Sequence, residues 1–438
     1  WLQAHPAVHL VSRRLPAAPP AFAQGLVLHD AAIARSALQG RSEDALLAED
    51  AALARRLRRG LSLAEAAAGG GGAALVRRGL PKFFDLDVGA LAGPLRATGN
   101  CAAKESLPRT CAGSGGASRA RELVAGALAE QLRGVWAVGQ RVRVLKLGKA
   151  NGENAQVSFF PATQQWVLCS KNVALLAAAP AEVKLPQWGD RRFRFARSVA
   201  ELWFDQLQLL DAKRQETLRE VLSEQTLVGE LIGSLAHLVD YSGERALRWF
   251  AVVPHSGDDI CWPPGRSLSF FRQMGLPAVS MQLVGSPCGY ARPEELLGML
   301  HTVAHSVERA SLAEEGEGSV LYFVAASPAV AGDDLRTLSL GKLKTAEYRL
   351  LRRLREKAKH FARGGGSVII EDVVAEFRAD AGQLAVGGQT AEEHAQALER
   401  VCRYIYAEDL SPEAVDESFL EVLARARDFR SAAGPRPP

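Results

Sequence analysis

Residues 142–160 read VRVLKLGKANGENAQVSFF, in which two β-like runs flank a short polar turn. The runs are rich in Val, Leu and Phe, and the turn contains Asn and Gly, so the stretch predicts two strands joined by a tight connection. Lys149 lies at the start of that turn, where the neighbouring strands would hold it on a rigid platform. Gly152 would let the backbone approach a nucleotide closely.

The sequence on either side of this stretch mixes short strands with helices and shows no regular alternation of the two. That mixture predicts an α+β fold. We expect strands over residues 141–147, 155–160, 166–170, 247–253 and 319–324. We expect helices over residues 118–133, 199–222 and 292–308.

Both ends of the chain carry apolar residues at helical spacing. Near the N-terminus, residues 42–63 predict a helix, and the glycines at 69–72 predict a flexible joint. Beyond Lys344 we expect helices over residues 347–361, 390–406 and 411–429, and a disordered end at 436–438. The expected domains are a helical Ala/Arg-rich N-terminal segment (1–77), a central domain (78–345) and an α-helical C-terminal domain (346–438).

Composition bounds the class of protein. Hydrophobic residues make up 47% of the 438 positions and charged residues 23%, which is an ordinary globular balance. A net charge of +4 does not by itself require a nucleic-acid partner, so local basic clusters matter more. None of the six cysteines forms C-x-x-C, which favours reduced thiols in an intracellular, reducing compartment. No apolar run reaches the roughly 18 residues of a membrane span, so no membrane partner is expected.

Lys149 has the chemistry of a nucleophile. Its amine can attack the α-phosphate of ATP, expel pyrophosphate and become lysyl-AMP. A lysine in a turn is more often a solvated surface residue, so Lys149 alone is a weak signal. Further polar residues come later in the chain in a fixed order, with Ser170 and Lys171 after a strand, Glu230 beside two glycines, Glu317 at a strand start, and Lys342 alternating with Lys344.

Each of these residues fits one part of a reaction with ATP. Glu230 can accept hydrogen bonds from the ribose hydroxyls, and Glu317 can hold a hydrated metal near the phosphates. Lys342 and Lys344 would share one face of an extended chain and stabilise charge on the α-phosphate. Singly, each residue is more often an ordinary surface group, and the ordered set is what indicates chemistry.

This order resembles the motifs shared by covalent nucleotidyltransferases, which include RNA ligases, DNA ligases and capping enzymes. Lys149-Ala-Asn-Gly looks like motif I, with Asn151 in place of the usual Asp, as in fungal tRNA ligases. The later segments that look like family motifs are Ser170-Lys171-Asn172 (similar to Ser-Lys-His), Gly229-Glu230 (motif III), Glu317-Gly318 (motif IV) and Lys342-Leu343-Lys344 (motif V). Upstream, PKFFD at residues 81–85 is similar to the Pro-Lys-Phe-Phe-Asn of tRNA ligases.

The resemblance covers residues 78–360 and is greatest to the RNA ligase branch. It implies an antiparallel-sheet nucleotidyltransferase core, of the ATP-grasp-like DNA/RNA ligase type, with ATP between its sheets and an α-helical C-terminal domain. It also implies lysyl-AMP on Lys149, ATP with Mg²⁺ (or Mn²⁺) as cofactors, and Glu317 as a metal ligand. The implied partner is RNA with 5′-phosphate and 3′-hydroxyl ends.

The same resemblance implies the residues that contact the nucleotide. An aromatic residue near adenine falls at Trp249-Phe250, and Phe250 is our candidate although the sequence leaves the choice open. The other nucleotide-binding candidates are Asn151, Gly152, Ser170, Lys171, Glu230, Lys342 and Lys344.

Other functions stay open at this point. The same fold could guanylate RNA ends or transfer AMP to a different acceptor, and a non-catalytic relative could serve as an RNA-binding module. No kinase P-loop or phosphodiesterase His-x-Thr pair comes after the ligase-like core, so the end-healing domains of a full tRNA-splicing enzyme are not expected in this chain.

Two basic segments are candidate RNA contacts. Residues 188–197 alternate arginines with Phe193 and Phe195, which suits single-stranded RNA, although a basic edge strand explains the pattern as well. Residues 349–363 are rich in Lys and Arg and would form either a solvated helix face or a track for RNA phosphates.

Overall fold

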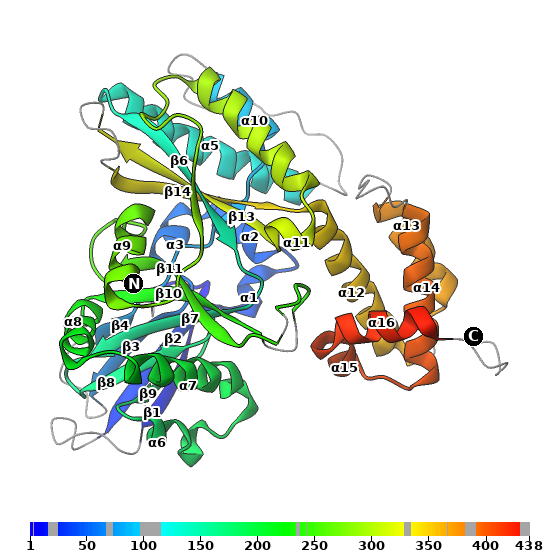
Figure 1. Cartoon of the computed structure of the whole chain (residues 1–438), viewed down its shortest axis with the longest axis horizontal. Helices are drawn as coiled ribbons and strands as arrows, with labels where there is room; N and C mark the ends of the chain where they lie inside the picture. Colours follow the sequence, from blue (N-terminus) through cyan, green and yellow to red (C-terminus); the bar gives the residue numbers. More distant parts are fainter. Residues whose placement is uncertain are drawn as a thin grey trace.

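The computed structural model describes residues 1–2, 4–15, 25–66, 73–96, 115–233, 237–241, 243–327, 334–365, 367–381 and 391–429 (Figure 1). The expected joint at 69–72 and the expected disordered end at 436–438 lie outside these residues. Among the helices that are described, none is long and apolar enough to cross a membrane.

Two five-stranded sheets form the centre of the molecule. The first has the order β11-β10-β7-β8-β9, and the second has the order β12-β6-β13-β14-β5. Paired strands in both sheets are antiparallel, except that β14 and β5 run parallel. The expected α+β class with antiparallel sheets is confirmed.

The five expected strands correspond to β6, β7, β8, β11 and β13, whereas β5, β9, β10, β12 and β14 were not among the expected strands. Those of the first sheet are β7 (Glu153–Phe160), β8 (Gln165–Cys169), β9 (Ala174–Ala177), β10 (Gln225–Ile232) and β11 (Ala246–Pro254). Those of the second sheet are β5 (Phe84–Asp85), β6 (Arg141–Lys149), β12 (Met281–Val284), β13 (Gly318–Ala326) and β14 (Asp334–Lys344). Since β6 and β7 belong to different sheets, the turn after Lys149 is where the chain crosses from one sheet to the other.

An apolar layer lies between the two sheets. Leu145 and Leu147 of β6 pack there with Val228 of β10 and with Val320 and Tyr322 of β13. The alternate residues of β6, Val142 and Val144, pack into a different cluster on the other face. This two-residue alternation is the normal geometry of a strand, and β6 carries apolar residues on both of its faces because each face packs against a core cluster.

Helices cover the outer face of each sheet (Figure 1). The cluster beside the second sheet includes α4 (Val88–Arg96), α5 (Gly115–Ala137) and α10 (Pro293–Arg309). The cluster beside the first sheet includes α7 (Arg194–Gln208), α8 (Ala212–Leu222) and α9 (Pro264–Met274). Trp203 of α7 meets Trp166 of β8 and Trp249 of β11 edge to face, at 5.1 and 5.7 Å between ring centroids. Such aromatic pairs add to the apolar area that anchors α7 on the sheet.

The N-terminal part differs from the expectation of a helical segment. It forms a third, four-stranded sheet in the order β1-β2-β3-β4. Its strands are β1 (Val8–Leu15), β2 (Leu26–Ile33), β3 (Leu61–Ala66) and β4 (Ala74–Arg77), with short helices α1 (Arg35–Leu38), α2 (Glu43–Glu49) and α3 (Ala51–Arg56) between β2 and β3.

A single helix over residues 42–63 was therefore a wrong prediction. The side chain of Asp50 accepts a hydrogen bond from the amide of Leu53, so it ends α2 and caps α3. Gly60, at φ +69°, turns the chain, and Leu61 then pairs with Ala31 of β2. Ala and Leu favour helices, but pairing with a neighbouring strand overrides that weak preference.

The N-terminal sheet is joined to the first central sheet through a buried ionic cluster. Arg77 is fully buried and donates to Asp30, to Ser62 and to the backbone carbonyl of Ser170, the last at 3.1 Å. Because a buried guanidinium needs such partners, the cluster fixes the turn at Ser170 against the N-terminal sheet.

Helices form the C-terminal part as expected. They are α12 (Ala346–Gly364), α13 (Ile370–Ala381), α14 (Ala391–Ala407), α15 (Pro412–Glu417) and α16 (Phe419–Asp428). The expected helix over 411–429 is split at Ser418, and α13 was not anticipated. Thr345 caps α12 directly after β14, so the C-terminal helices continue from the strand that carries Lys342 and Lys344.

Candidate active site

Lys149 of β6 and Lys344 of β14 lie in one row across the second sheet. Gly318 of β13 pairs with Lys149 on one side and with Lys344 on the other. Gly318 has a φ of +137°, and a Cβ there would lie 2.2 Å from the carbonyl oxygen of Leu343. Only glycine fits this position, and it lets β13 bring both lysines to the same end of the sheet.

Glu317 immediately precedes β13 and contacts Lys149. The distance from Lys149 Nζ to Glu317 Oε2 is 2.7 Å, and the carboxylate is almost completely buried. Sequence reasoning proposed the nucleophile and the metal ligand from two motifs 168 positions apart (149 and 317). The structure brings the two side chains into direct contact.

Asn151 connects the turn after Lys149 to two other segments. Its Oδ1 accepts hydrogen bonds from the backbone amides of Leu238 (2.7 Å) and Val239 (3.2 Å). Since amides only donate, these bonds identify the oxygen end of the side chain. The Nδ2 end therefore donates to Glu317 Oε2 and to the Tyr348 hydroxyl, both at 3.2 Å. An aspartate could not make these donations and would place a second carboxylate against Glu317.

Glu230 approaches the same turn from β10 in the first sheet. A Cβ on Gly152 would lie 2.3 Å from the carbonyl oxygen of Leu231 and 2.7 Å from Cγ of Glu230. Gly152 is therefore required by the close approach of β10. Burial raises the pKa of Glu230 to about 7, against the opposing effects of Lys149 and of the Gly152 amide.

A small cavity opens beside Lys149 between the two sheets. Lys149, Ala150 and Glu230 line its polar side, and Phe83, Phe250, Val320 and Tyr322 line its apolar side. Phe250 lies in this cavity, whereas Trp249 is fully buried on the other face of β11 and donates its Nε1–H to Gln206. Of the two aromatic candidates, the structure places Phe250 beside Lys149.

Lys342 and Lys344 lie on the same side of β14, as their alternation predicted. Each Nζ lies 3.8 Å from Asp85 Oδ1 on the neighbouring strand β5. Burial lowers the pKa of Lys342 to about 8, with Asp85 opposing the shift and Lys344 adding to it. Burial also lowers the pKa of Lys344. Partly desolvated cations of this kind bind anions more strongly than cations in open water do.

Ser170 and Lys171 are not among the residues that line the cavity. Ser170 is buried in the turn after β8, where its carbonyl accepts the hydrogen bond from Arg77, and Lys171 is exposed in the same turn. Asn151, Gly152, Lys342 and Lys344 are likewise outside the lining of this cavity.

A resident metal would have few protein ligands here. Among the described residues, no group of three or more His, Cys, Asp and Glu side chains could hold a metal ion. Mg²⁺ commonly binds through one or two carboxylates, several waters and substrate phosphates. The single buried carboxylate of Glu317 beside Lys149 fits that arrangement, in which the nucleotide supplies the other ligands.

Sequence reasoning missed four contributors to this site. Phe83 lines the cavity, and Asp85 faces the two lysines of β14. The Tyr348 hydroxyl accepts a hydrogen bond from the side chain of Asn151, and the Tyr241 hydroxyl accepts one from the backbone amide of Asn151 at 2.6 Å. The PKFFD segment at residues 81–85 was a signal for Phe83 and Asp85. Nothing in the local sequence marked the two tyrosines.

The basic segment at residues 188–197 is not a strand. It contains two 3₁₀ turns and the start of α7. Trp188 and Phe193 are fully buried and contact each other at 5.2 Å between centroids, so their rings cannot stack on bases. Arg191 and Arg194 instead pair with Glu417 of α15. The segment contributes to the contact with the C-terminal helices.

No family model and no curated protein matches this chain. Comparison with solved structures finds similarity to an archaeal ATP-dependent RNA ligase, at 16% identity and a TM-score of 0.44, over 91% of this chain and 75% of the other. A putative ATP-dependent DNA ligase from Aquifex aeolicus aligns over 84% of this chain and 71% of its own length, at 14% identity and a TM-score of 0.33. RNA ligase from Naegleria gruberi, in a structure with PPi, aligns over 50% of this chain and 54% of its own length, at 13% identity and a TM-score of 0.31. Similarity at this level does not by itself assign an activity, so a functional assignment has to come from the geometry around Lys149.

Proposed function

We propose that this protein is an ATP-dependent RNA ligase that works through a lysyl-AMP intermediate on Lys149. The observation that carries the proposal is the meeting of Lys149, Glu317 and Lys344 at one end of the second sheet, beside a cavity lined by Phe83 and Phe250. A nucleophile, an acidic group and partly buried cations next to an apolar pocket are the parts that transfer of a nucleotide requires.

Each part of ATP finds a chemical counterpart in this site. The base would occupy the apolar side of the cavity against Phe250 and Phe83. Glu230 would accept hydrogen bonds from the ribose hydroxyls in its ionised form. Lys342 and Lys344 would face the phosphates, where their charge offsets the negative charge that develops during transfer.

In the first step, the neutral amine of Lys149 attacks the α-phosphorus of ATP. The N–P bond forms while the bond to the bridging oxygen breaks, pyrophosphate leaves with the electron pair, and the nitrogen loses a proton. The ion pair with Glu317 must open for this attack, because an ammonium has no lone pair. A divalent cation held by Glu317 and the phosphates would supply charge neutralisation.

The later steps reuse the same phosphorus chemistry. An oxygen of the RNA 5′-phosphate attacks the AMP phosphorus, and the Lys149 nitrogen leaves as it regains a proton. The 3′-hydroxyl oxygen of a second RNA end then attacks the phosphorus of the 5′-phosphate and loses its proton to water. A phosphodiester forms, the anhydride bond breaks, and AMP leaves with the electron pair. We assign RNA as the substrate because the motif order is most similar to RNA ligases.

Sealing of RNA that already carries AMP on its 5′ end tests this three-step route. Lys149→Ala should fail to join 5′-phosphate RNA with ATP but should still join pre-adenylated RNA without ATP, since only the last step is then required. The wild-type protein should do both, and DNA ends offered in parallel would show whether RNA is preferred. Failure of the wild-type protein to join pre-adenylated ends would overturn the ligase assignment, and labelling with GTP in place of ATP would favour RNA guanylylation.

A further inference from the structure

The basic run at residues 349–363 divides between two faces of α12. On one face, Arg355 and Lys359 lie 3.6 and 2.9 Å from Asp416 of α15. These ion pairs attach α12 to the other C-terminal helices, so this half of the run is neutralised within the protein. Ion pairs also occur on the groove side, where Arg349 pairs with Glu308 and Lys357 pairs with Glu376, whereas Arg352 has no such partner among the described residues.

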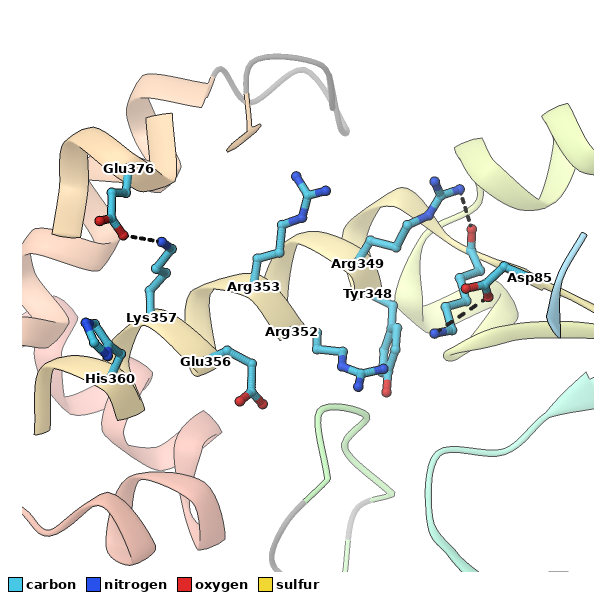
Figure 2. Close-up of a pocket in the computed structure, with 10 residues that line it drawn as sticks. Asp85, Tyr348, Arg349, Arg352, Arg353, Glu356, Lys357, His360 and Glu376 are labelled. Atoms are coloured by element: carbon cyan, nitrogen blue, oxygen red, sulfur yellow. Dashed lines mark hydrogen bonds and ion pairs between the residues drawn. The ribbon is translucent and has the colours of Figure 1, made fainter. Parts of the chain in front are cut away.

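The other face of α12 borders a groove of about 710 Å³ that begins at Lys344. Its basic lining consists of Lys344, Arg349, Arg352, Arg353 and Lys357. Figure 2 shows Arg349, Arg352, Arg353 and Lys357 projecting from successive turns of the helix. The spacing of i, i+4 and i+8 places Arg349, Arg353 and Lys357 in one helical stripe, and Arg352 borders the groove from the side of Tyr348 (Figure 2).

The charge in this groove is greatest at the end nearest the candidate active site. Arg352 and Arg353 are both exposed, and Arg352 makes no ion pair with any described residue. Among the acidic lining residues, Asp85 faces Lys344 at the near end, whereas Glu356 and Glu376 lie toward the far end, where Lys357 pairs with Glu376 at 2.5 Å (Figure 2). Clustered like charges are unfavourable in the free protein, and an anion bound between them would relieve that cost.

We propose that this groove holds the RNA strand whose 5′-phosphate is to be activated, with the backbone following α12 and the terminal phosphate at Lys344. The proposal rests on the ligase function and deepens it by naming a path for one substrate strand. The α12 residues that line the groove run from Arg349 to His360, which is 11 steps along the helix (349 to 360) or about 17 Å at 1.5 Å per step, long enough for several nucleotides. The 5′-phosphate strand is favoured over the 3′-hydroxyl strand because only the former carries a charged terminal group.

Binding of a labelled single-stranded RNA of about 12 nucleotides, measured without ATP, tests the path. The stripe variant, Arg352→Gln/Arg353→Gln/Lys357→Gln, removes three charges from the basic lining of the groove. The matched control is Lys213→Gln/Arg214→Gln/Arg219→Gln, which removes the same residue types from α8, far from α12 in the molecule (Figure 1). With a slope of about −0.7 per phosphate contact, losing three contacts should flatten the salt dependence by about 2. Between 50 and 200 mM salt, the wild-type affinity should then fall about 18-fold more than that of the stripe variant.

The wild-type protein should also bind 5′-phosphate RNA more tightly than 5′-hydroxyl RNA, and the stripe variant should lose that preference. Equal salt slopes in the stripe variant and the wild-type protein would overturn the path. So would an α8 control whose salt slope flattens as much as that of the stripe variant. Formation of lysyl-AMP is measured in parallel. If the stripe variant forms lysyl-AMP and binds RNA as the wild-type protein does, the proposed RNA path is wrong but the ligase function is not. If the wild-type protein forms no lysyl-AMP, the ligase function itself is wrong.

Discussion

Lys149 and Glu317 form an ion pair with 2.7 Å between Nζ and Oε2, and this pair joins the expected nucleophile to the expected metal ligand. In this arrangement the carboxylate holds the amine in place but also occupies the group that must attack. A divalent cation that draws Glu317 toward the phosphates would free the amine, so the first step should depend on both the carboxylate and the cation.

Glu317→Gln should lower the rate of lysyl-AMP formation by a factor of about 100 or more, as for the loss of one preorganised electrostatic contact. Any remaining rate should respond weakly to Mg²⁺ concentration. Glu315→Gln is a matched control. Glu315 lies two residues before Glu317 in the chain, and it pairs with Lys146 rather than with Lys149. Single-turnover adenylation across a Mg²⁺ series measures both variants, and a wild-type response in Glu317→Gln would remove this residue from the site.

Glu230→Gln should stabilise the protein while it weakens ATP binding. Burial raises the pKa of Glu230 from 4.5 to about 7, so the folded state holds this proton more tightly than the unfolded state does. Its ionisation therefore costs stability progressively as the pH rises from about 4.5 through 7. Glutamine avoids that cost, and its advantage should grow by about 2 kcal/mol between pH 5 and pH 8.

Thermal melting of wild-type protein and Glu230→Gln at the two pH values measures this difference. Glu224→Gln, at an exposed position just before β10, should show no such growth. An advantage of Glu230→Gln that is the same at pH 5 and pH 8 would show that burial does not hold this carboxyl in its protonated form.

Asn151→Asp should destabilise the site in the absence of a divalent cation. The variant keeps an acceptor for Leu238 and Val239 but loses the donor to Glu317 and Tyr348. Removing the donor from a buried hydrogen bond costs about 1–3 kcal/mol. The new carboxylate at position 151 would also repel the carboxylate of Glu317. Mg²⁺ should therefore raise the melting temperature of Asn151→Asp more than that of the wild-type protein. Asn172→Asp, in the turn after β8, is the control, and equal Mg²⁺ effects in all three proteins would contradict the role of Asn151.

Lys342→Arg should extend ATP binding to higher pH. The pKa of Lys342 is lowered to about 8, so its charge is present below that pH and is lost above it. If this charge holds the phosphates, the affinity of the wild-type protein for ATP should fall above pH 8 by up to about tenfold per unit. Arginine stays charged throughout and should flatten the curve. Dissociation constants for ATP at pH 7, 8 and 9 provide the test, and parallel curves for the two proteins would exclude the role.

Several strands and most helices around the site could be predicted from sequence because their patterns are local. Residues 142–160 alternate in apolar character and contain a turn, so both β6 and β7 were expected. The N-terminal sheet could not be found this way, since Leu61, Leu63 and Ala64 fit a helical spacing as well as a strand. Pairing of β3 with β2, which is more than 25 residues away in the chain, decides between the two.

The sequence located most charged members of the candidate site, but it missed Asp85 and could not predict the contacts between them. Motif order located Lys149, Glu230 and Glu317, and the structure brings all three together. Tyr348 lies on a helix whose sequence signals only amphipathic packing, so its contact with Asn151 depends on where α12 leaves β14. The close approach of β10 to Gly152 could not be predicted, because no sequence pattern shows which strand lies beside it.

Covalent labelling with α-labelled ATP and Mg²⁺, followed by a denaturing gel, tests the central claim most directly. The wild-type protein should acquire label that is released in acid and retained in alkali, as expected for a phosphoramidate on a lysine nitrogen. Lys149→Ala should acquire none, whereas Lys146→Ala, which changes the lysine three positions earlier on β6, should still label. Full labelling of Lys149→Ala, or no labelling of the wild-type protein, would contradict the assignment of Lys149 as the nucleophile.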